Sequence, residues 1–434
     1  DENRIRHLDY GVQFNGLMYE RFLRDENITL FSPNDVPGLY DSFFADQKKF
    51  KKLYVNFEKD DSIRKQQINA RELFAMFMKE RANTGRIYLQ NVDHCNTHGA
   101  FDPSQAPIKQ SNLCMEITLP TKPLYSVQDK EGEVALCTLS AVNLGAIDSL
   151  DELEDITDII VRSLDSLLDY QDYPLKSAEI TSNNRRTLGI GVTNLAYYLA
   201  KNDAKYSDGS GNDLIHRTFE ALQYFSLKAS NEIAQEFGPC PLFSETQYAK
   251  GVMPIDSYKK DIDQFCNTEL ELDWDSLRKN IQATGLRNST LTALMPCESS
   301  SQISNSTNGI EPPRGFISVK QSKDGILKQV VPEYEKLHKK YELLWDIKDN
   351  EGYLQLCAIM QKFVDQSIST NTHYDPSQYD GNRVPMKLFL MDLLKAYKYG
   401  IKTLYYHTTR DGASDGQNTT AKGDDDCEDG VCKL

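Results

Sequence analysis

Hydrophobic and polar positions alternate over residues 110–119, which read QSNLCMEITL. In an extended strand, successive side chains point to opposite faces, so Asn112, Cys114 and Glu116 would share one face while the apolar residues share the other. Neighbours on such a face lie roughly 6–7 Å apart, because each residue rises about 3.3 Å. The pattern therefore predicts a strand that presents an amide, a thiol and a carboxyl to one small polar substrate. Pattern alone more often indicates an amphipathic edge strand with a half-buried cysteine.

The same-face neighbours of Cys114 bear on its chemistry. Nucleophilic thiolates usually have a cation or a helix N-terminus beside them. Here the nearest same-face charge is Glu116, and a carboxylate raises the pKa of a thiol. A neutral thiol beside a carboxylate suits hydrogen-atom chemistry with the carboxylate as general base.

Further along the chain, helix-like and strand-like segments alternate. Apolar periodicity, caps and breakers predict helices over 71–82, 152–168, 213–237, 352–363 and 386–399. We place the N-cap of the long helix at Asp213 and its end at Gly238. Short apolar runs predict strands over 86–90, 135–139, 187–192 and 400–407. Such alternation predicts an α/β fold with parallel strands and crossover connections.

Three regions differ in character. Residues 1–110 are expected to be mostly helical connecting structure, and 111–410 carry the alternating elements. Residues 411–434 are small, polar and acidic, which is typical of a flexible segment. Cys427 and Cys432 lie in this tail, and a mobile tail would let the two thiols visit a distant pocket.

Composition narrows the class of protein. With 434 residues, 39% hydrophobic residues and a net charge of -15, the chain is typical of a globular protein that binds neither nucleic acid nor an anionic membrane directly. No apolar run approaches the roughly 18 residues of a membrane span, and the start shows no signal-peptide pattern. Nine scattered cysteines favour a reducing cytoplasm.

Several motifs together carry a resemblance to a known family. They are NLCME at 112–116, Cys137 in ALCTLSAVNLG, PCESSSQ at 296–302, NGIEPPRG at 308–315, Tyr405-Tyr406, and the Cys427–Cys432 pair. In order and spacing these marks resemble the large, catalytic subunit of class I ribonucleotide reductase. The resemblance implies a ten-stranded β/α barrel made of two five-stranded halves, with the Cys114 segment as a finger loop through its centre. This chain would supply the second half and part of the first.

The resemblance also implies a role for each catalytic residue in the reduction of ribonucleoside diphosphates. Cys114 would carry a transient thiyl radical that takes the ribose 3′ hydrogen atom, and Glu116 would accept the 3′-hydroxyl proton. Asn112 would hold the substrate by hydrogen bonding. Cys137 would be one of two thiols that end as a disulfide, which Cys427 and Cys432 would then reduce by thiol exchange.

Substrate binding is expected at two segments. The first is Ser111 with Asn112 and Glu116. The second is a turn that would hold the substrate diphosphate, made of Pro296, Cys297, Glu298, Ser299 and Ser300. Cys297 stands where such proteins often have a small hydroxyl residue, which puts its contribution in doubt. Pattern alone would favour an ordinary capped turn here.

Tyr405 and Tyr406 would relay an electron and a proton toward Cys114. Adjacent tyrosines in a strand point to opposite faces, so packing is the usual explanation for such a pair. Arg86 and Tyr88 are placed near this relay. The other cysteines are interpreted as structural thiols; they are Cys95, Cys240, Cys266 and Cys357.

The resemblance begins in mid-protein, because the chain starts at Asp1 without the upstream part of the family. We expect an N-terminal half that binds nucleotide effectors (ATP or dNTP) and supplies the second redox thiol. The sequence leaves open whether the split is natural or a truncation. Further expected partners are a small subunit with a tyrosyl radical at a diiron site, and thioredoxin or glutaredoxin. No cofactor or metal is expected in this chain itself.

Two other functions stay open at this point. One is a cobalamin-dependent reductase of the same barrel type, against which the tyrosine pair argues. The other is a non-catalytic remnant that only binds a partner. Intact Asn112, Cys114, Glu116 and Cys137 argue against such decay.

Overall fold

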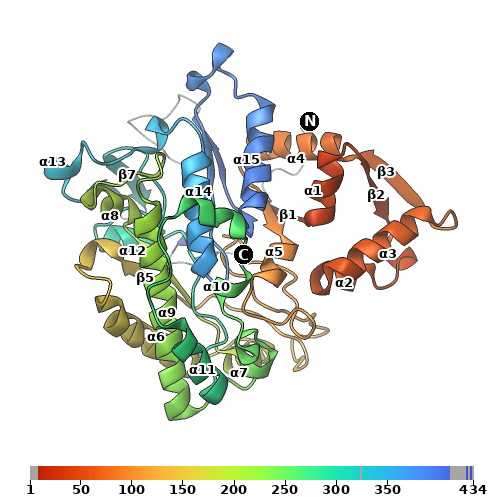
Figure 1. The fold of residues 1–434 in the computed structure, drawn as a ribbon, viewed down its shortest axis with the longest axis horizontal. Coiled ribbons are helices and arrows are strands. Elements are labelled where there is room, and N and C mark those ends of the chain that lie inside the picture. Colours follow the sequence, from red (N-terminus) through yellow and green to blue (C-terminus); the bar gives the residue numbers. More distant parts are fainter. Residues whose placement is uncertain (1–7, 323–324, 411–426, 429–430, 433–434) are drawn as a thin grey trace.

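The computed structural model of the chain describes residues 8–322, 325–410, 427–428 and 431–432. It shows a mixed α/β fold in which helices surround short sheets (Figure 1). Within these described ranges, no helix combines the length and the apolar character needed to cross a bilayer.

Strand β4 (Ile87–Asn91) is the centre of the largest sheet, whose order is β1-β4-β10. It pairs in parallel with β1 (Tyr10–Phe14) and antiparallel with β10 (Thr403–Leu404). Phe14 and Leu89 are buried, which anchors the sheet in the main core. This sheet therefore joins strands from the first hundred residues to a strand that begins only at Thr403.

A succession of parallel pairings follows on the other side of the molecule. Strand β5 (Leu139–Asn143) pairs in parallel with β6 (Gly189–Thr193). Parallel bridges then join Ile190 to Thr292 and Leu294 to Ile368. Strand β9 (Thr372–Tyr374) pairs in parallel with β11 (His407–Thr409). Across the described residues these pairings form sheets of two and three strands and not one closed sheet.

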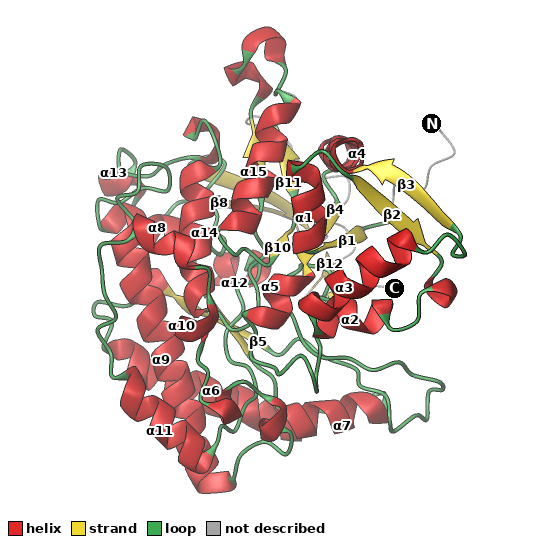
Figure 2. Ribbon diagram, turned by 45° about the vertical axis from the view of Figure 1, so that its right-hand side comes forward, coloured by secondary structure: helices red, strands yellow, loops and turns green. Residues whose placement is uncertain are grey.

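Helices cover these strands (Figure 2). Helix α6 (Glu152–Tyr170) packs on α9 (Asn212–Phe237), and Arg162 of α6 pairs with Glu236 of α9 at 2.6 Å. Helix α14 (Glu351–Phe363) is almost entirely buried beside α9. The remaining helices of this part are α7 (Lys176–Arg185), α8 (Leu195–Lys201), α10 (Pro254–Ser257), α11 (Trp274–Thr284), α12 (Glu298–Ile303), α13 (Tyr334–Leu337) and α15 (Met386–Lys398).

Elements near the beginning of the chain form a side lobe, drawn in red and orange in Figure 1. It contains α1 (Gly16–Leu23), α2 (Leu39–Ala45), α3 (Gln47–Lys59) and the antiparallel pair β2 (Asn27–Phe31) and β3 (Lys65–Asn69). The lobe has a small core of its own that includes Leu39, Phe50 and Tyr54. Helices α4 (Ala70–Thr84) and α5 (Val92–Thr97) connect it to β4 and to the main core.

Two hairpins complete the described strands. Strand β7 (Ile317–Ser322) pairs antiparallel with β8 (Gly325–Val330). In the tail, the backbone of β12 (Cys427–Glu428) pairs antiparallel with β13 (Val431–Cys432), with Cys427 opposite Cys432. The predicted flexibility of 411–434 lies otherwise outside the described residues.

All five predicted helices are confirmed, with small shifts of their ends, as α4, α6, α9, α14 and α15. Gly85 and Gly238 end α4 and α9 with positive φ, as glycine permits most easily. The proposed N-cap at Asp213 is wrong, because the helix begins at Asn212 and its N-cap is Gly211. The Asp213 carboxylate instead accepts from the backbone N–H of Asn267 at 2.8 Å.

Three strand predictions need correction. The strand expected at 135–139 begins only at Leu139, where pairing with Gly189 starts. The strand expected at 400–407 is broken between β10 and β11, so that Tyr405 and Tyr406 lie in the break. Residues 110–119 form no strand at all; they contain a turn.

Candidate active site

Cys114 lies in a tight turn. The N–H of Met115 donates to the carbonyl of Asn112 at 3.2 Å, and Met115 adopts a φ of 72°, which is uncommon for a residue with a Cβ. Leu113 is 40% exposed while Met115 is 5% exposed, so the expected apolar face does not exist. The predicted strand alternation is therefore wrong, and a turn now brings the polar groups together.

Asn112 links two of the predicted catalytic groups. Its Nδ2 donates to Oε1 of Glu116 at 2.8 Å and lies 3.7 Å from Sγ of Cys137. Its Oδ1 accepts from the backbone N–H of Ile117 at 3.1 Å. Because both ends of the Asn112 amide are held, the Glu116 carboxyl and the Cys137 thiol keep a fixed position relative to each other. Beside them, the Ser111 hydroxyl donates to the carbonyl of Asn112 at 2.9 Å.

Glu116 is buried, with 2% of its surface exposed. Burial raises the pKa of its carboxyl, while hydrogen bonds from Asn112 and Ser369 oppose that rise. The Ser369 hydroxyl lies 3.1 Å from Oε2 of Glu116 and donates to the carbonyl of Cys114 at 2.5 Å. A raised pKa makes the ionised carboxyl a better proton acceptor.

Three tyrosine rings adjoin Cys114. The hydroxyl of Tyr405 lies 3.7 Å from Sγ of Cys114, and Tyr88 packs against Tyr405 with ring centroids 4.8 Å apart. Tyr405 and Tyr406 have ring centroids only 3.9 Å apart, at an angle of 42°. A regular strand would place the two rings on opposite faces of the chain, and the short distance between them excludes that arrangement. Burial and the neighbouring Cys114 raise the pKa of Tyr405, so its phenol is neutral near pH 7.

The turn at 296–300 leads into α12. Ser299 and Ser300 are exposed at its start, and Glu298 accepts from Nδ2 of Asn308 at 2.8 Å. Cys297 is buried; its Sγ lies 3.5 Å from the carbonyl oxygen of Val192, and burial raises its pKa to about 11. The thiol of Cys297 therefore points into the core, and Pro296, which is half-buried, precedes it. A hydrogen bond with the Ser300 side chain opposes the rise in the pKa of this thiol, so Cys297 also contacts one of the serines.

The other cysteines lie apart from this cluster. Cys95, Cys240 and Cys357 are buried, and Cys266 is half-buried. Burial raises the pKa of each to about 12, which makes them unreactive as thiolates. The side chains of Cys427 and Cys432 lie outside the described part of the structure, so their proposed shuttle stays a prediction.

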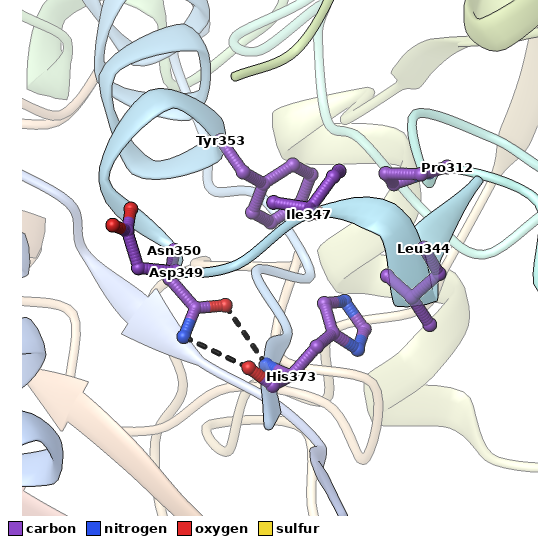
Figure 3. Close-up of a pocket in the computed structure, with 7 residues that line it drawn as sticks. All are labelled: Pro312, Leu344, Ile347, Asp349, Asn350, Tyr353 and His373. Atoms are coloured by element: carbon purple, nitrogen blue, oxygen red, sulfur yellow. Dashed lines mark hydrogen bonds between the residues drawn. The ribbon is translucent and has the colours of Figure 1, made fainter. Parts of the chain in front are cut away.

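A small pocket lies between residues of the 312–353 segment and His373 and is shown in Figure 3. Asn350 holds the backbone of His373 there, with Nδ2 donating to its carbonyl at 3.1 Å and Oδ1 accepting from its N–H at 2.9 Å. The lining residues are Pro312, Leu344, Ile347, Asp349, Asn350, Tyr353 and His373. Because none of them is a predicted site residue, this pocket is separate from the Cys114 cluster.

Two residues that contact the site were not found from the sequence. Ser369 joins Cys114 to Glu116, and its only signal is a run of serine and threonine in a stretch that turns out to be buried. Arg81 is fully buried and donates to the carbonyls of Tyr405 and Tyr406. The sequence did contain an indication of Arg81. It follows Phe74 and Phe77 on one apolar face of the predicted helix, where a charged residue is unusual.

Comparison with known proteins agrees with this geometry. Residues 1–407 match the family described as ribonucleotide reductase, barrel domain. The whole chain is 65% identical to the ribonucleoside-diphosphate reductase subunit alpha of Haemophilus influenzae and to the ribonucleoside-diphosphate reductase 1 subunit alpha of Escherichia coli. It is 50% identical over 441 residues to the corresponding subunit alpha of Enterobacteria phage T4.

The chain therefore belongs to the ribonucleotide reductase barrel-domain family. It spans 57% of the length of each of these relatives. Its shared part includes the Cys114 turn, the Cys137 segment and the tyrosine pair, since the match covers all of this chain.

Proposed function

We propose that the chain catalyses the radical-based reduction of ribonucleoside diphosphates to deoxyribonucleoside diphosphates, together with partners. One observation carries the proposal: Tyr405, Cys114 and Glu116 meet at one place, with Asn112 joining the carboxyl to Cys137. A phenol that can deliver a radical, a thiol that can receive it and a carboxyl that can take a proton are what this chemistry needs.

The first chemical step uses the Cys114 turn. A Cys114 thiyl radical takes the ribose 3′ hydrogen atom and becomes a thiol, which leaves a carbon radical on the substrate. Glu116 accepts the 3′-hydroxyl proton, and its raised pKa suits that role. Asn112 keeps Glu116 in place and can donate to the substrate hydroxyls.

Reducing equivalents come from thiols. Cys137 and a second thiol outside this chain supply two electrons and two protons and end as a disulfide, while the 2′-hydroxyl leaves as water. Cys114 then returns its hydrogen atom to the 3′ carbon, which completes the deoxy product and regenerates the thiyl radical. Cys427 and Cys432 then reduce that disulfide by exchange and become a disulfide themselves. Thioredoxin or glutaredoxin reduces the tail again.

The turn from Pro296 to Ser300 is proposed to bind the substrate diphosphate. Exposed hydroxyls of Ser299 and Ser300 support this role. Cys297 is buried and its thiol bonds with Ser300, so its proposed part is to hold the turn. A small electrostatic effect of Glu116 on the pKa of Cys297 supports a position of this turn near Glu116.

The proposed enzyme needs components that this chain does not contain. A complementary N-terminal segment completes a ten-stranded barrel around the Cys114 turn and binds nucleotide effectors. The successive parallel pairings from β5 to β11 support a half-barrel in this chain. A small subunit with a tyrosyl radical at a diiron site supplies the radical that Tyr406 and Tyr405 pass on.

Reconstitution tests the proposal. The chain, a complementary N-terminal segment and a radical-generating small subunit are mixed with a ribonucleoside diphosphate, and the deoxy product is measured. We expect product only when all three are present and reductant is supplied. Activity that requires cobalamin and not the small subunit would favour the cobalamin-dependent alternative. Association without any product would favour the partner-binding remnant.

A further inference from the structure

Arg81 occupies an unusual place for a guanidinium. It lies on α4 with none of its surface exposed, in a stripe shared with Phe74 and Phe77. In the described part of the chain it forms no ion pair with a carboxylate, and its Nε has no hydrogen-bond partner. A buried charge without a counter-ion is costly, so its other contacts must compensate.

Those contacts are three backbone carbonyls. Nη1 donates to the carbonyl of Ile87 at 2.5 Å and to that of Tyr405 at 2.7 Å. Nη2 donates to the carbonyl of Tyr406 at 3.1 Å. The planar, forked guanidinium can serve several acceptors at once in a fixed arrangement, which an ammonium group cannot do in the same way.

The directions of these carbonyls show how Arg81 affects the backbone. In a regular strand, successive carbonyls and successive side chains point in opposite directions. Here the carbonyls of Tyr405 and Tyr406 both reach one guanidinium, so the chain is kinked between β10 and β11. The kink brings the two rings to 3.9 Å, although they belong to adjacent residues.

The third carbonyl extends this arrangement to β4. Ile87 immediately precedes Tyr88, whose ring packs at 4.8 Å from Tyr405. Gly85, at the end of α4, adds a backbone bond by accepting from the N–H of His407 at 3.1 Å. The C-terminal end of α4 thus holds the backbone of the tyrosine pair, of His407 directly after it, and of Ile87 directly before Tyr88.

We propose that Arg81 is a positioning residue for radical transfer: its guanidinium clamps the kink at Tyr405-Tyr406 and thereby holds the two rings in contact within reach of Cys114. The effect of Arg81 on radical transfer rests on the proposed function. Its effect on the position of the two rings rests on the geometry alone. Arg81 itself contacts no substrate and exchanges no electron.

The fixed charge adds an electrostatic consequence. Burial lowers the pKa of Arg81 to about 10, which leaves it cationic at neutral pH. A positive charge near the rings disfavours a cationic phenol radical, since like charges repel strongly where the dielectric constant is low. The electron therefore leaves each tyrosine together with its proton.

The test compares Arg81→Gln and Arg81→Lys with Arg185→Lys in the reconstituted assembly. Arg185 is the matched control, because it is equally buried but is paired with Glu133 and Glu245 away from the tyrosines. We expect kcat to fall about 100-fold in Arg81→Gln, as a displacement of about 1 Å can cause, with KM within about twofold. The kcat of Arg81→Lys should lie between that of the wild type and that of Arg81→Gln, since lysine keeps the positive charge but not the forked geometry.

The second readout is structural. Crystal structures of the Arg81 variants should show the rings of Tyr405 and Tyr406 moved apart, while that of Arg185→Lys should not. A kcat loss no larger than that of Arg185→Lys, or rings that stay in contact in Arg81→Gln, would overturn the proposal. If the wild-type assembly makes no deoxy product, the proposed function fails, and the ring geometry still decides the role of Arg81. Should Arg81→Gln not fold, Arg81→Lys carries both measurements.

Discussion

The hydroxyl of Tyr405 lies 3.7 Å from the sulfur of Cys114, although 291 residues separate them in the sequence. Their buried contact also includes Tyr88 and Met115. A phenol and a thiol at this distance can exchange a hydrogen atom after a small approach. This distance supports the proposed radical transfer between Tyr405 and Cys114.

Tyr405→Phe should abolish turnover while the chain still folds, because phenylalanine keeps the ring and removes the only transferable hydrogen. Tyr374→Phe is the matched control, since Tyr374 is equally buried and donates to Asp392 at 2.7 Å. The control should retain turnover and lose about 1.5–3 kcal/mol of stability, as expected for one lost hydrogen bond to a carboxylate that still accepts from Asn350. Product formation and thermal melting measure the two effects; normal turnover in Tyr405→Phe would contradict the relay.

Cys114→Ser should abolish turnover without loss of folding or association. Serine fits the turn, but its O–H bond is too strong to yield the needed radical. Cys240→Ser serves as control, because Cys240 is buried and lies outside the cluster. Deoxynucleotide formation and co-purification with the partners are measured, and residual activity in Cys114→Ser would refute the assigned role.

The pH dependence of kcat should report on Glu116. Only its ionised form accepts a proton, so kcat should rise as pH increases through its raised pKa. Ser369→Ala removes a hydrogen bond that lowers this pKa, and the acid limb should therefore move to higher pH. Ser304→Ala, which affects an exposed hydroxyl on another segment, should leave the limb in place. An unchanged limb in Ser369→Ala would mean that Glu116 is not the titrating base.

Glu311 should make the fold less stable as pH rises. Burial and the charge of Glu298 raise its pKa to about 7 from an ordinary 4.5, while the amide of Asn371 opposes this rise. Between these values the unfolded chain releases the proton and the folded chain keeps it. The free energy of unfolding should therefore fall by at most about 3 kcal/mol from pH 4.5 to 7.

The substitution Glu311→Gln should remove that dependence, because the neutral amide can still accept from Asn371. Denaturant unfolding at several pH values measures the difference between the variant and the wild type. Glu335→Gln, at an exposed position, should leave the pH profile of the wild type unchanged. A profile in Glu311→Gln identical to the wild type would assign the dependence to another group.

Cys427→Ser should separate single from multiple turnover. With thiols reduced beforehand, one turnover needs only Cys137 and its partner thiol, so the first product should form normally. Further turnovers with thioredoxin should stop, because the tail can no longer close its own disulfide. Rapid-quench and steady-state assays measure the two phases. An equal loss of product in both assays would contradict the proposed shuttle of Cys427 and Cys432.

The sequence predicted the helices well because their signals are local. The apolar stripe of α4 and the glycine at its end depend on residues only a few positions apart. Pattern also selected Asn112, Cys114 and Glu116 as one group, and they do converge. The reason was wrong, since the turn at Met115 and not strand alternation brings them together.

The tyrosine kink could not have been predicted in this way. A run of apolar and aromatic residues at 400–407 indicates a strand, and nothing local indicates a break. At the break, the carbonyls of Tyr405 and Tyr406 accept from Arg81, which is 324 residues away from Tyr405 in the sequence. Ser369 is a similar case, because its partners Cys114 and Glu116 lie more than 250 positions earlier. Tertiary contacts of this kind override local propensity.

Strand β4 also determines when the chain becomes competent during its synthesis. Its β1 partner leaves the ribosome before it, but its β10 partner follows only after more than three hundred further residues. Until Thr403 and Leu404 have docked, Tyr405 cannot approach the sulfur of Cys114. A chain that ends before Thr403 therefore lacks both strand β10 and the tyrosine whose hydroxyl lies 3.7 Å from the sulfur of Cys114.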